Sequence, residues 1–148
     1  MSPLDATQAR TLLDAAREAA AHHYAPYSRY AVGAALLTDQ GEIIAGANIE
    51  NISYGLTLCA ERVAIACAVS RGLRTFSAIA VWAQEESFGA VTPCGACRQT
   101  MAEFMTGETL VISADGATGA LRQTLLGDLL PDAFQGKGLT TSTGEAPC

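Results

Sequence analysis

The hydrophobic positions of the chain follow two periods, and the change between them divides the sequence into helices and strands. Near the N-terminus apolar residues recur at helical spacing, at Leu12, Leu13, Ala16, Ala19 and Ala20. We expect Ser2 to cap this helix, with Pro3 at its first position and Asp5 in its first turn. The helix is expected to end before Ala25-Pro26, because the residue before a proline resists helical backbone angles.

The rest of the chain predicts an α/β fold. Strands are expected where buried, β-branched or alternating residues run together, at 30–38, 42–50, 76–83, 109–113 and 121–125, with a hairpin turn at 39–41. Helices are expected at 59–70 and 95–105, where a glycine follows each end, and a short helical turn precedes Leu130-Pro131. This alternation predicts a three-layer α-β-α sandwich around a mixed sheet of about five strands.

Length and charge limit the classes of function. The chain has 148 residues, 49% of them hydrophobic, which fits a single domain over residues 1–135. Residues 136–148 are mostly Gly, Ser and Thr with few anchors, so we expect a mobile tail there. The net charge of -6 disfavours DNA or RNA as a partner and favours a small substrate. No apolar run approaches the ~20 residues of a membrane span, and no signal peptide is visible, so we expect a cytoplasmic protein with no membrane contact.

Three cysteines carry the chemistry that the sequence indicates most clearly. Cys59 is followed by Glu61, and Cys94 and Cys97 form a Pro-Cys-x-x-Cys segment. Each segment lies at a predicted strand-to-helix junction, where the helix N-terminus stabilises thiolates. Three thiolates suit Zn²⁺ and leave a fourth tetrahedral position for water, with the glutamate as its acid and base. Because side chains tilt toward the helix N-terminus, Cys59 and Glu61 can both reach a metal that lies ahead of the helix.

Two other interpretations of these cysteines remain open. The Cys-x-x-Cys pair alone would also suit a redox pair or a structural zinc site with a fourth ligand. Cys67 is a poor candidate for that ligand, because it lies two turns along the helix from Cys59 and is expected in the core. Cys148 lies in the predicted tail. The absence of a well-placed fourth ligand therefore favours an open, catalytic metal site.

Polar residues at the end of the second predicted strand indicate a substrate surface. Asn48 and Glu50 are two apart on that strand, so their side chains are expected to point the same way. An amide beside a carboxylate offers donors and acceptors to the hydroxyl pair of a sugar. Tyr30 is a candidate for stacking on a planar base, although a core aromatic residue would look the same in sequence.

With these residues identified, the chain closely resembles the small, homotetrameric cytidine deaminases. The resemblance runs from Tyr24 to Phe134, and it is most specific in three segments: Asn48-Ile49-Glu50-Asn51, Tyr54-Gly55-Leu56-Thr57-Leu58-Cys59-Ala60-Glu61-Arg62, and Pro93-Cys94-Gly95-Ala96-Cys97-Arg98-Gln99. The chain departs from the family pattern at Tyr30, where the family usually has Phe, and at Ile52, where it usually has a small residue.

The resemblance implies an activity and a set of roles. The activity is zinc-dependent deamination of cytidine and 2′-deoxycytidine by water, in pyrimidine salvage, by a homotetramer with shared active sites. One zinc ion per chain would be held by Cys59, Cys94 and Cys97, with Glu61 carrying protons. Substrate contacts would come from Asn48, Glu50, Tyr30, Tyr54, the backbone of Ala60, and Phe134, which would reach a neighbouring subunit's site. Gln99 and Arg62 would support the ligands.

Arg62 is placed to act on the charge of the three cysteines. Three thiolates and Zn²⁺ sum to about -1, and Arg62 lies one helical turn after Cys59. We expect Arg62 to donate hydrogen bonds to ligand sulfurs and partly offset their charge. The alternative is a surface arginine in a solvent-exposed ion pair.

Three other functions share part of this pattern. A blasticidin-type deaminase shares the Cys-Ala-Glu and Pro-Cys-x-x-Cys segments, but Asn48, Glu50 and Arg62 favour cytidine. A polynucleotide-editing deaminase is disfavoured by the acidic charge. A structural zinc module that mediates assembly would hold a closed metal with four ligands and show no turnover.

Overall fold

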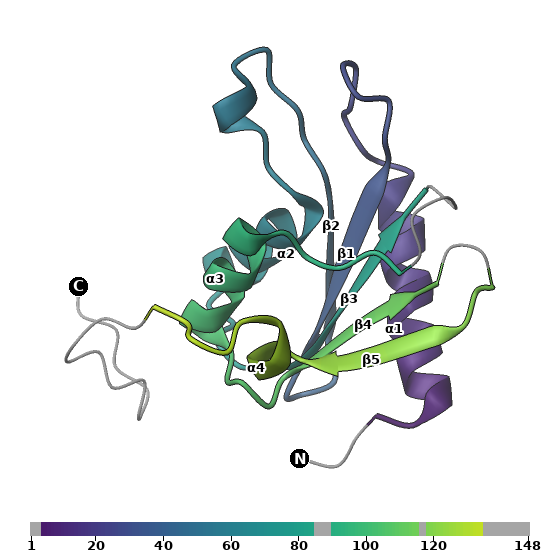
Figure 1. Ribbon diagram of the computed structural model, residues 1–148, viewed down its shortest axis with the longest axis vertical. Coiled ribbons are helices and arrows are strands. Elements are labelled where there is room, and N and C mark those ends of the chain that lie inside the picture. The colour runs from purple at the N-terminus through teal and green to yellow at the C-terminus, as the bar shows by residue number, and fades with distance from the viewer. Residues whose placement is uncertain (1–3, 85–89, 116–117, 135–148) are drawn as a thin grey trace.

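A mixed sheet lies at the centre of the computed structural model, which describes residues 4–84, 90–115 and 118–134 (Figure 1). The strands are β1 (Val32–Thr38), β2 (Ile43–Ala47), β3 (Phe76–Ala83), β4 (Leu110–Ala114) and β5 (Leu121–Leu125). Their order across the five-stranded sheet is β2-β1-β3-β4-β5. Strands β3 and β4 are parallel, and the other neighbouring pairs are antiparallel. The mixed sheet predicted from the sequence is confirmed.

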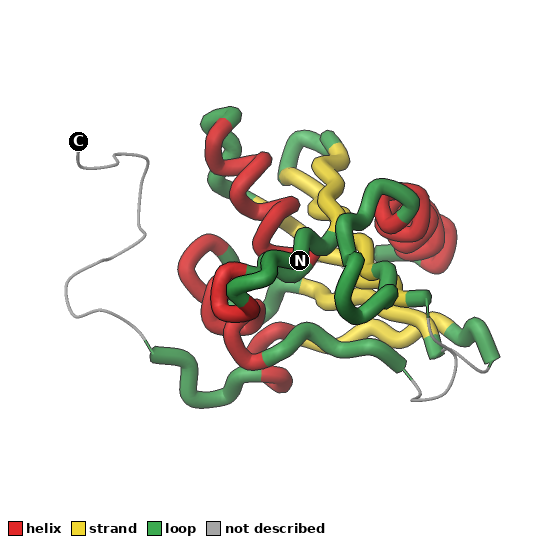
Figure 2. The backbone as a smooth tube through the Cα atoms, turned by 90° about the horizontal axis from the view of Figure 1, so that it is seen from above, coloured by secondary structure: helices red, strands yellow, loops and turns green. Residues whose placement is uncertain are grey.

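Helices cover both faces of this sheet. Helix α1 (Ala6–Ala20) packs on one face, and α2 (Ala60–Ser70), α3 (Gly95–Phe104) and α4 (Leu126–Leu129) lie on the other, as Figure 2 shows from above. Alternate residues of β1 divide between the two cores: Leu36 packs with α2, whereas Ala35 packs with α1. The predicted three-layer α-β-α sandwich is therefore confirmed.

Helix α1 begins later and ends earlier than the sequence suggested. Asp5 is its N-cap rather than a first-turn residue, and the Asp5 carboxylate accepts the Gln8 N–H at 2.8 Å. The expected positions of Ser2 and Pro3 lie outside the described residues. The helix ends at Ala20, because the chain then turns and the Tyr24 N–H donates to the Asn48 carbonyl at 3.0 Å. A tertiary pairing with the segment after β2 thus ends the helix before Pro26 does.

Strand β2 also ends early, at Ala47 instead of residue 50. The Asn48 side chain takes over the hydrogen bonds that the strands would have made. Its Oδ1 atom accepts the Val32 N–H at 2.9 Å, and its Nδ2 atom donates to the Tyr30 carbonyl at 2.9 Å. The same contacts explain why β1 begins at Val32 rather than at residue 30. Strands β3 and β5 have the predicted bounds, and β1 ends at Thr38 as predicted. The start of β2 and both ends of β4 differ from the prediction by one residue.

Helix α2 is held close to the edge strand β2 by the absence of a side chain. A Cβ atom at Gly46 would lie 2.6 Å from the backbone nitrogen of Ala64 and 3.1 Å from the carbonyl oxygen of Ala60. The first turn of α2 therefore rests directly on the strand. At the other end, the Gly72 N–H donates to the Val69 carbonyl and the Leu73 N–H to the Ala68 carbonyl, which confirms Gly72 as the stop.

No helix in the described ranges has the length and apolar character that a membrane span requires. The predicted tail, residues 136–148, lies outside the described residues.

Candidate metal and catalytic site

The N-terminal ends of α2 and α3 bring the three cysteines together. Cys59 is the N-cap of α2 and Cys94 is the N-cap of α3, while Cys97 is the third residue of α3. Neither N-cap side chain makes a capping hydrogen bond to a backbone N–H of its helix. Their thiols are therefore available to each other ahead of the helix ends, and the partial positive charge there favours thiolates.

The spacing of the three sulfur atoms suits a tetrahedral metal. Cys94 Sγ lies 3.5 Å from Cys97 Sγ and 3.9 Å from Cys59 Sγ, and all three lie within 4.8 Å of one another. Sulfurs that share a zinc ion at about 2.3 Å are about 3.8 Å apart in ideal tetrahedral geometry. The cluster therefore fits Zn²⁺ by both ligand type and distance, and a fourth position remains for a non-protein ligand.

The protonation states within the cluster are unequal. Hydrogen bonds from the Cys97 thiol, from Arg62 and from Cys94 lower the pKa of Cys59 to about 5, against the opposing effect of burial. The pKa of Cys97 is raised, because its thiol donates to the Cys59 thiolate and because it is buried. Without metal, the negative charge of this pair therefore resides on Cys59.

Glu61 is a buried carboxyl group beside this cluster. It is the second residue of α2, and its exposed fraction is only 4%. Burial raises its pKa, and the negative charge of Cys59 adds to the increase, whereas hydrogen bonds from its own backbone and from Cys97 oppose it. A carboxyl group with a raised pKa binds a proton more readily than a free carboxyl group does, which suits a group that takes up and releases protons.

Arg62 lies beside Cys59, as the sequence predicted. Its Nη2 atom donates to the Thr57 carbonyl at 2.9 Å and approaches Cys59 Sγ at 3.8 Å. The hydrogen bond and the charge of Cys59 raise the pKa of Arg62 further. The Nε atom is buried without a hydrogen-bond partner among the described residues. Arg62 is thus directed at the sulfur and at the loop before α2, and the alternative of a surface ion pair is not what the structure shows.

Asn48 and Glu50 were expected on one face of the second strand, but both follow the end of β2. Both side chains turn back onto the segment 27–32. Glu50 accepts the N–H of Tyr27 at 2.8 Å and that of Ser28 at 3.2 Å. The pKa of Glu50 is lowered, chiefly by a hydrogen bond from the Ser28 side chain, and the backbone N–H groups of Tyr27 and Ser28 lower it further. The carboxylate stays charged at neutral pH and has acceptor capacity left for a further donor.

The remaining candidates occupy two loops, the start of α2 and the C-terminal segment. Tyr54 lies in the short helix η1 (Tyr54–Leu56) and meets Tyr27 edge-on, with ring centroids 5.7 Å apart. Ala60 opens α2 and is fully buried. Phe134 is 82% exposed at the end of the described chain. Tyr30 is partly buried and its carbonyl accepts from Asn48.

Arg98 is a residue of the site that sequence reasoning missed. Its Nε atom donates to the Pro93 carbonyl at 2.7 Å, and its Nη1 atom donates to the Leu129 carbonyl at 2.8 Å. It therefore braces the loop that carries Cys94. The sequence did contain a signal for this role, because Arg98 directly follows the candidate ligand Cys97. An arginine has five donors in a fixed geometry, which suits binding to the carbonyl groups of a loop.

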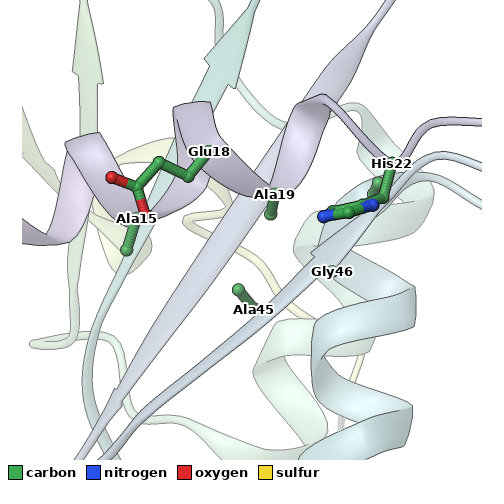
Figure 3. Close-up of a pocket in the computed structure, with 7 residues that line it drawn as sticks. Ala15, Glu18, Ala19, His22, Ala45 and Gly46 are labelled. Carbon is green, nitrogen blue, oxygen red and sulfur yellow. The ribbon is translucent and has the colours of Figure 1, made fainter.

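Cys67 and a hollow beside α1 both lie apart from the three-cysteine cluster. Cys67 is exposed rather than in the core, because it lies on the solvent side of α2, and it does not belong to the three-cysteine group. A hollow of about 360 Å³ lies between α1 and β2, where Glu18 and His22 line one side and Ala45 the other (Figure 3). None of the three clustered cysteines lines it, so it is separate from the metal site.

Comparisons with known proteins agree with this geometry. A family model described as the cytidine and deoxycytidylate deaminase zinc-binding region matches residues 6–113. The cytidine deaminase of Halalkalibacterium halodurans is 51% identical, over 80% of this chain and 86% of that protein. The cytidine deaminase of Sporosarcina psychrophila is 45% identical, over 87% of this chain and 93% of that protein. A crystal structure of cytidine deaminase from Burkholderia pseudomallei has a TM-score of 0.79 at 47% identity, over 84% of this chain and 98% of that chain.

A more distant relative bears on the rival function. Blasticidin-S deaminase of Bacillus cereus is 33% identical, over 70% of this chain and 76% of that protein.

The fold and the thiol cluster define a zinc-binding deaminase domain of the α/β class. Within that class, the chain belongs to the cytidine and deoxycytidylate deaminase family.

Proposed function

We propose that this chain is a zinc-dependent cytidine deaminase, which converts cytidine and 2′-deoxycytidine with water into uridine and 2′-deoxyuridine plus ammonia. The observation that carries the proposal is the buried Glu61 carboxyl beside three converging thiols. Membership of the deaminase family supports the same reaction. In a cell this activity would serve pyrimidine salvage, and residues 1–135 would form the catalytic domain.

Cys59, Cys94 and Cys97 would hold the metal. When bound there, zinc would supply a Lewis acid that lowers the pKa of water toward neutrality. Glu61 accepts the proton that the attacking water loses and delivers a proton to N3 of the pyrimidine. Oxygen adds to C4, and Glu61 carries the second proton from oxygen to the amino nitrogen. The C4–N bond then breaks, so water is consumed and ammonia leaves.

Recognition of the sugar would fall to Asn48 and Glu50. Their side chains are already fixed by hydrogen bonds to the segment 27–32, so little ordering is needed when substrate binds. Glu50 would accept from a ribose hydroxyl, and the backbone of Ala60 would contact the base. Tyr30 and Tyr54 would contribute aromatic surface. Free cytosine should therefore be a poor substrate, because it leaves these polar groups unpaired.

We further propose a homotetramer with shared active sites, in the cytoplasm. Phe134 would complete the pocket of a neighbouring subunit, since its ring is 82% exposed in its own chain. The cytoplasm suits a protein whose cysteines must remain thiols to bind metal.

The test of this function is the ultraviolet absorbance of purified protein with cytidine, deoxycytidine, cytosine and blasticidin S. We expect turnover of both nucleosides, little with cytosine, and about one zinc per chain by metal analysis. The matched control is Glu61→Gln, which keeps the side-chain size but cannot carry protons, and it should retain zinc while losing nearly all turnover.

Each alternative has its own outcome in the same assay. A blasticidin-type enzyme would prefer blasticidin S over cytidine. A structural zinc module would hold zinc and show no turnover with any of the four compounds. Near-normal activity of Glu61→Gln would exclude Glu61 as the proton carrier.

A further inference from the structure

The two residues directly after Cys97 bind a segment that is distant in sequence. Arg98 and Gln99 continue helix α3, and both reach the chain that follows α4. Arg98 donates to the Leu129 carbonyl at 2.8 Å. Gln99 contacts the backbone of Phe134. The segment 129–134 is thus fastened to α3 at both of its ends.

The contact at Gln99 is a two-point clamp. Its Nε2 atom donates to the Phe134 carbonyl at 2.9 Å, and its Oε1 atom accepts the Phe134 N–H at 3.3 Å. A glutamine amide has the same donor and acceptor pair as a peptide group, so it can pair with one residue as a neighbouring strand would. Both backbone groups of Phe134 are held by one side chain.

Nothing else in the described chain holds Phe134 so directly. Its ring is 82% exposed, so packing within its own subunit contributes little to its position. Arg98 fixes the start of the segment and also donates to Pro93, next to Cys94. The hydrogen bonds of Arg98 and Gln99 therefore fix the position of Phe134 relative to α3, the helix that carries Cys97.

We propose that Gln99 is a positioning residue that holds Phe134 in place for substrate binding. The proposal rests on the proposed deaminase function, in which Phe134 completes a neighbouring subunit's pocket. The hydrogen bonds of the Gln99 side chain go to the Phe134 backbone and not to the cysteine ligands that the resemblance gave it to support, so Gln99 would act on the substrate through Phe134. Because Gln99 already holds the segment, less conformational entropy is lost when Phe134 takes part in substrate binding.

The experiment compares Gln99→Leu, which has similar size and no hydrogen-bonding group, with Gln99→Glu, which keeps the acceptor and loses the donor. For Gln99→Leu we expect KM for cytidine to rise about tenfold while kcat and zinc content stay near those of the unsubstituted protein. Gln99→Glu should give a smaller rise. The control is Glu103→Gln, at an exposed position on the same helix, which should change none of these values.

A double variant separates positioning from a general structural effect. In a Phe134→Ala background, Gln99→Leu should add no further increase in KM, because the ring that it positions is gone. Unchanged KM in Gln99→Leu would overturn the proposal. So would an additional increase in the double variant, or a loss of zinc together with kcat.

Hydrogen exchange keeps this test independent of activity. The Phe134 amide should exchange faster in Gln99→Leu than in the unsubstituted protein or in Glu103→Gln. If the unsubstituted chain did not deaminate cytidine, the proposed function would fail. Equal exchange rates in Gln99→Leu and the unsubstituted protein would separately show that Gln99 does not hold Phe134.

Discussion

Cys59 and Cys97 are chemically identical side chains in one cluster, and their surroundings shift their pKa values in opposite directions. Cys59 receives hydrogen bonds from Cys97, Arg62 and Cys94, which lower its pKa to about 5. Cys97 is the donor in this arrangement, so its pKa is raised. The metal-free cluster thus holds the Cys97 proton at neutral pH, and a metal that binds there must displace it.

Zinc uptake should therefore release protons. At pH 7 Cys59 is already a thiolate and contributes little, whereas Cys97 gives up its proton, so zinc affinity should rise as the pH rises. Titration calorimetry in two buffers with different ionisation enthalpies, at pH 6, 7 and 8, would measure the number of protons released. Apparent enthalpies that are equal in both buffers would contradict the prediction.

Arg62 should affect turnover and zinc binding through its contact with Cys59 Sγ. We expect Arg62→Ala to lower turnover and to loosen zinc by about 10–100-fold, because the charge of the thiolates is no longer offset. Arg62→Gln, which can still donate, should retain part of both. The control is Arg71→Ala, because Arg71 forms an exposed ion pair with Glu42 and should leave zinc retention unchanged. Turnover and zinc loss to a chelator would be measured for all three variants.

At this scale, the sequence predicted best those residues whose positions depend on local geometry. Cys59, Cys94 and Cys97 converge because a cap and a first turn fix them at helix ends. The directions of Asn48 and Glu50 could not be predicted, because they depend on where β2 leaves the sheet. That point is set by contacts with Tyr30 and Val32, sixteen or more residues away, which no local pattern encodes.

Among the elements, the junction of α2 with β2 determines where Cys59 and Glu61 lie. The first turn of α2 rests on Gly46, where a Cβ atom would lie 2.6 Å from a backbone nitrogen. A glycine within a predicted strand signals such a close approach, but the sequence does not say which helix will occupy the space. The ends of α1 and β2 were mispredicted for the same reason, since tertiary pairing at Tyr24 and Asn48 decided them.

Gly46→Ala should move α2 away from the sheet and disturb the metal site with it. We expect the free energy of unfolding to fall by about 1–3 kcal/mol, as for other overpacked positions, and zinc retention to fall as well. Gly55→Ala is the matched control for stability, because nothing lies within 4 Å of a Cβ atom there. Chemical denaturation and a chelator assay would measure the two effects. An unfolding midpoint equal to that of the unsubstituted protein would show that α2 tolerates the methyl group.

On the scale of the whole molecule, exposed hydrophobic side chains gather on the loops beside the site. These loops are residues 21–31 and 48–59, and they rise above the same end of the sheet (Figure 1). Backbone pairing of Ile49 with Tyr24 joins the two loops, and pairing of Ile49 with Leu58 lies within the second. Their exposed members are Tyr24, Tyr27, Ile49, Ile52, Tyr54, Leu56 and Leu58. Apolar surface of this kind next to a polar site is typical of a protein interface. A second copy of the chain would cover it in the proposed tetramer.

Sharing of active sites can be tested by mixing two defective chains. Glu61→Gln lacks the proton carrier but has Phe134, and Phe134→Ala has the proton carrier but lacks the ring. Phe134 is 82% exposed, so its truncation should leave the subunit folded. If Phe134 acts on a neighbour, then co-expressed chains at equal amounts should form complete sites in about a quarter of positions, by random assembly. If Phe134 acts within its own chain, then no complete site forms in any mixture.

We therefore expect the co-expressed mixture to turn over cytidine faster, at a concentration below KM, than the sum of the two variants measured separately. The gain arises because a Glu61-containing site beside a Phe134-containing neighbour is complete, whereas neither pure variant has such a pair. The control is a mixture of Glu61→Gln with the double variant Glu61→Gln, Phe134→Ala, which contains no proton carrier and should stay inactive. Activity of the first mixture equal to the sum of its parts, with mixed oligomers confirmed by mass spectrometry, would show that each chain works alone.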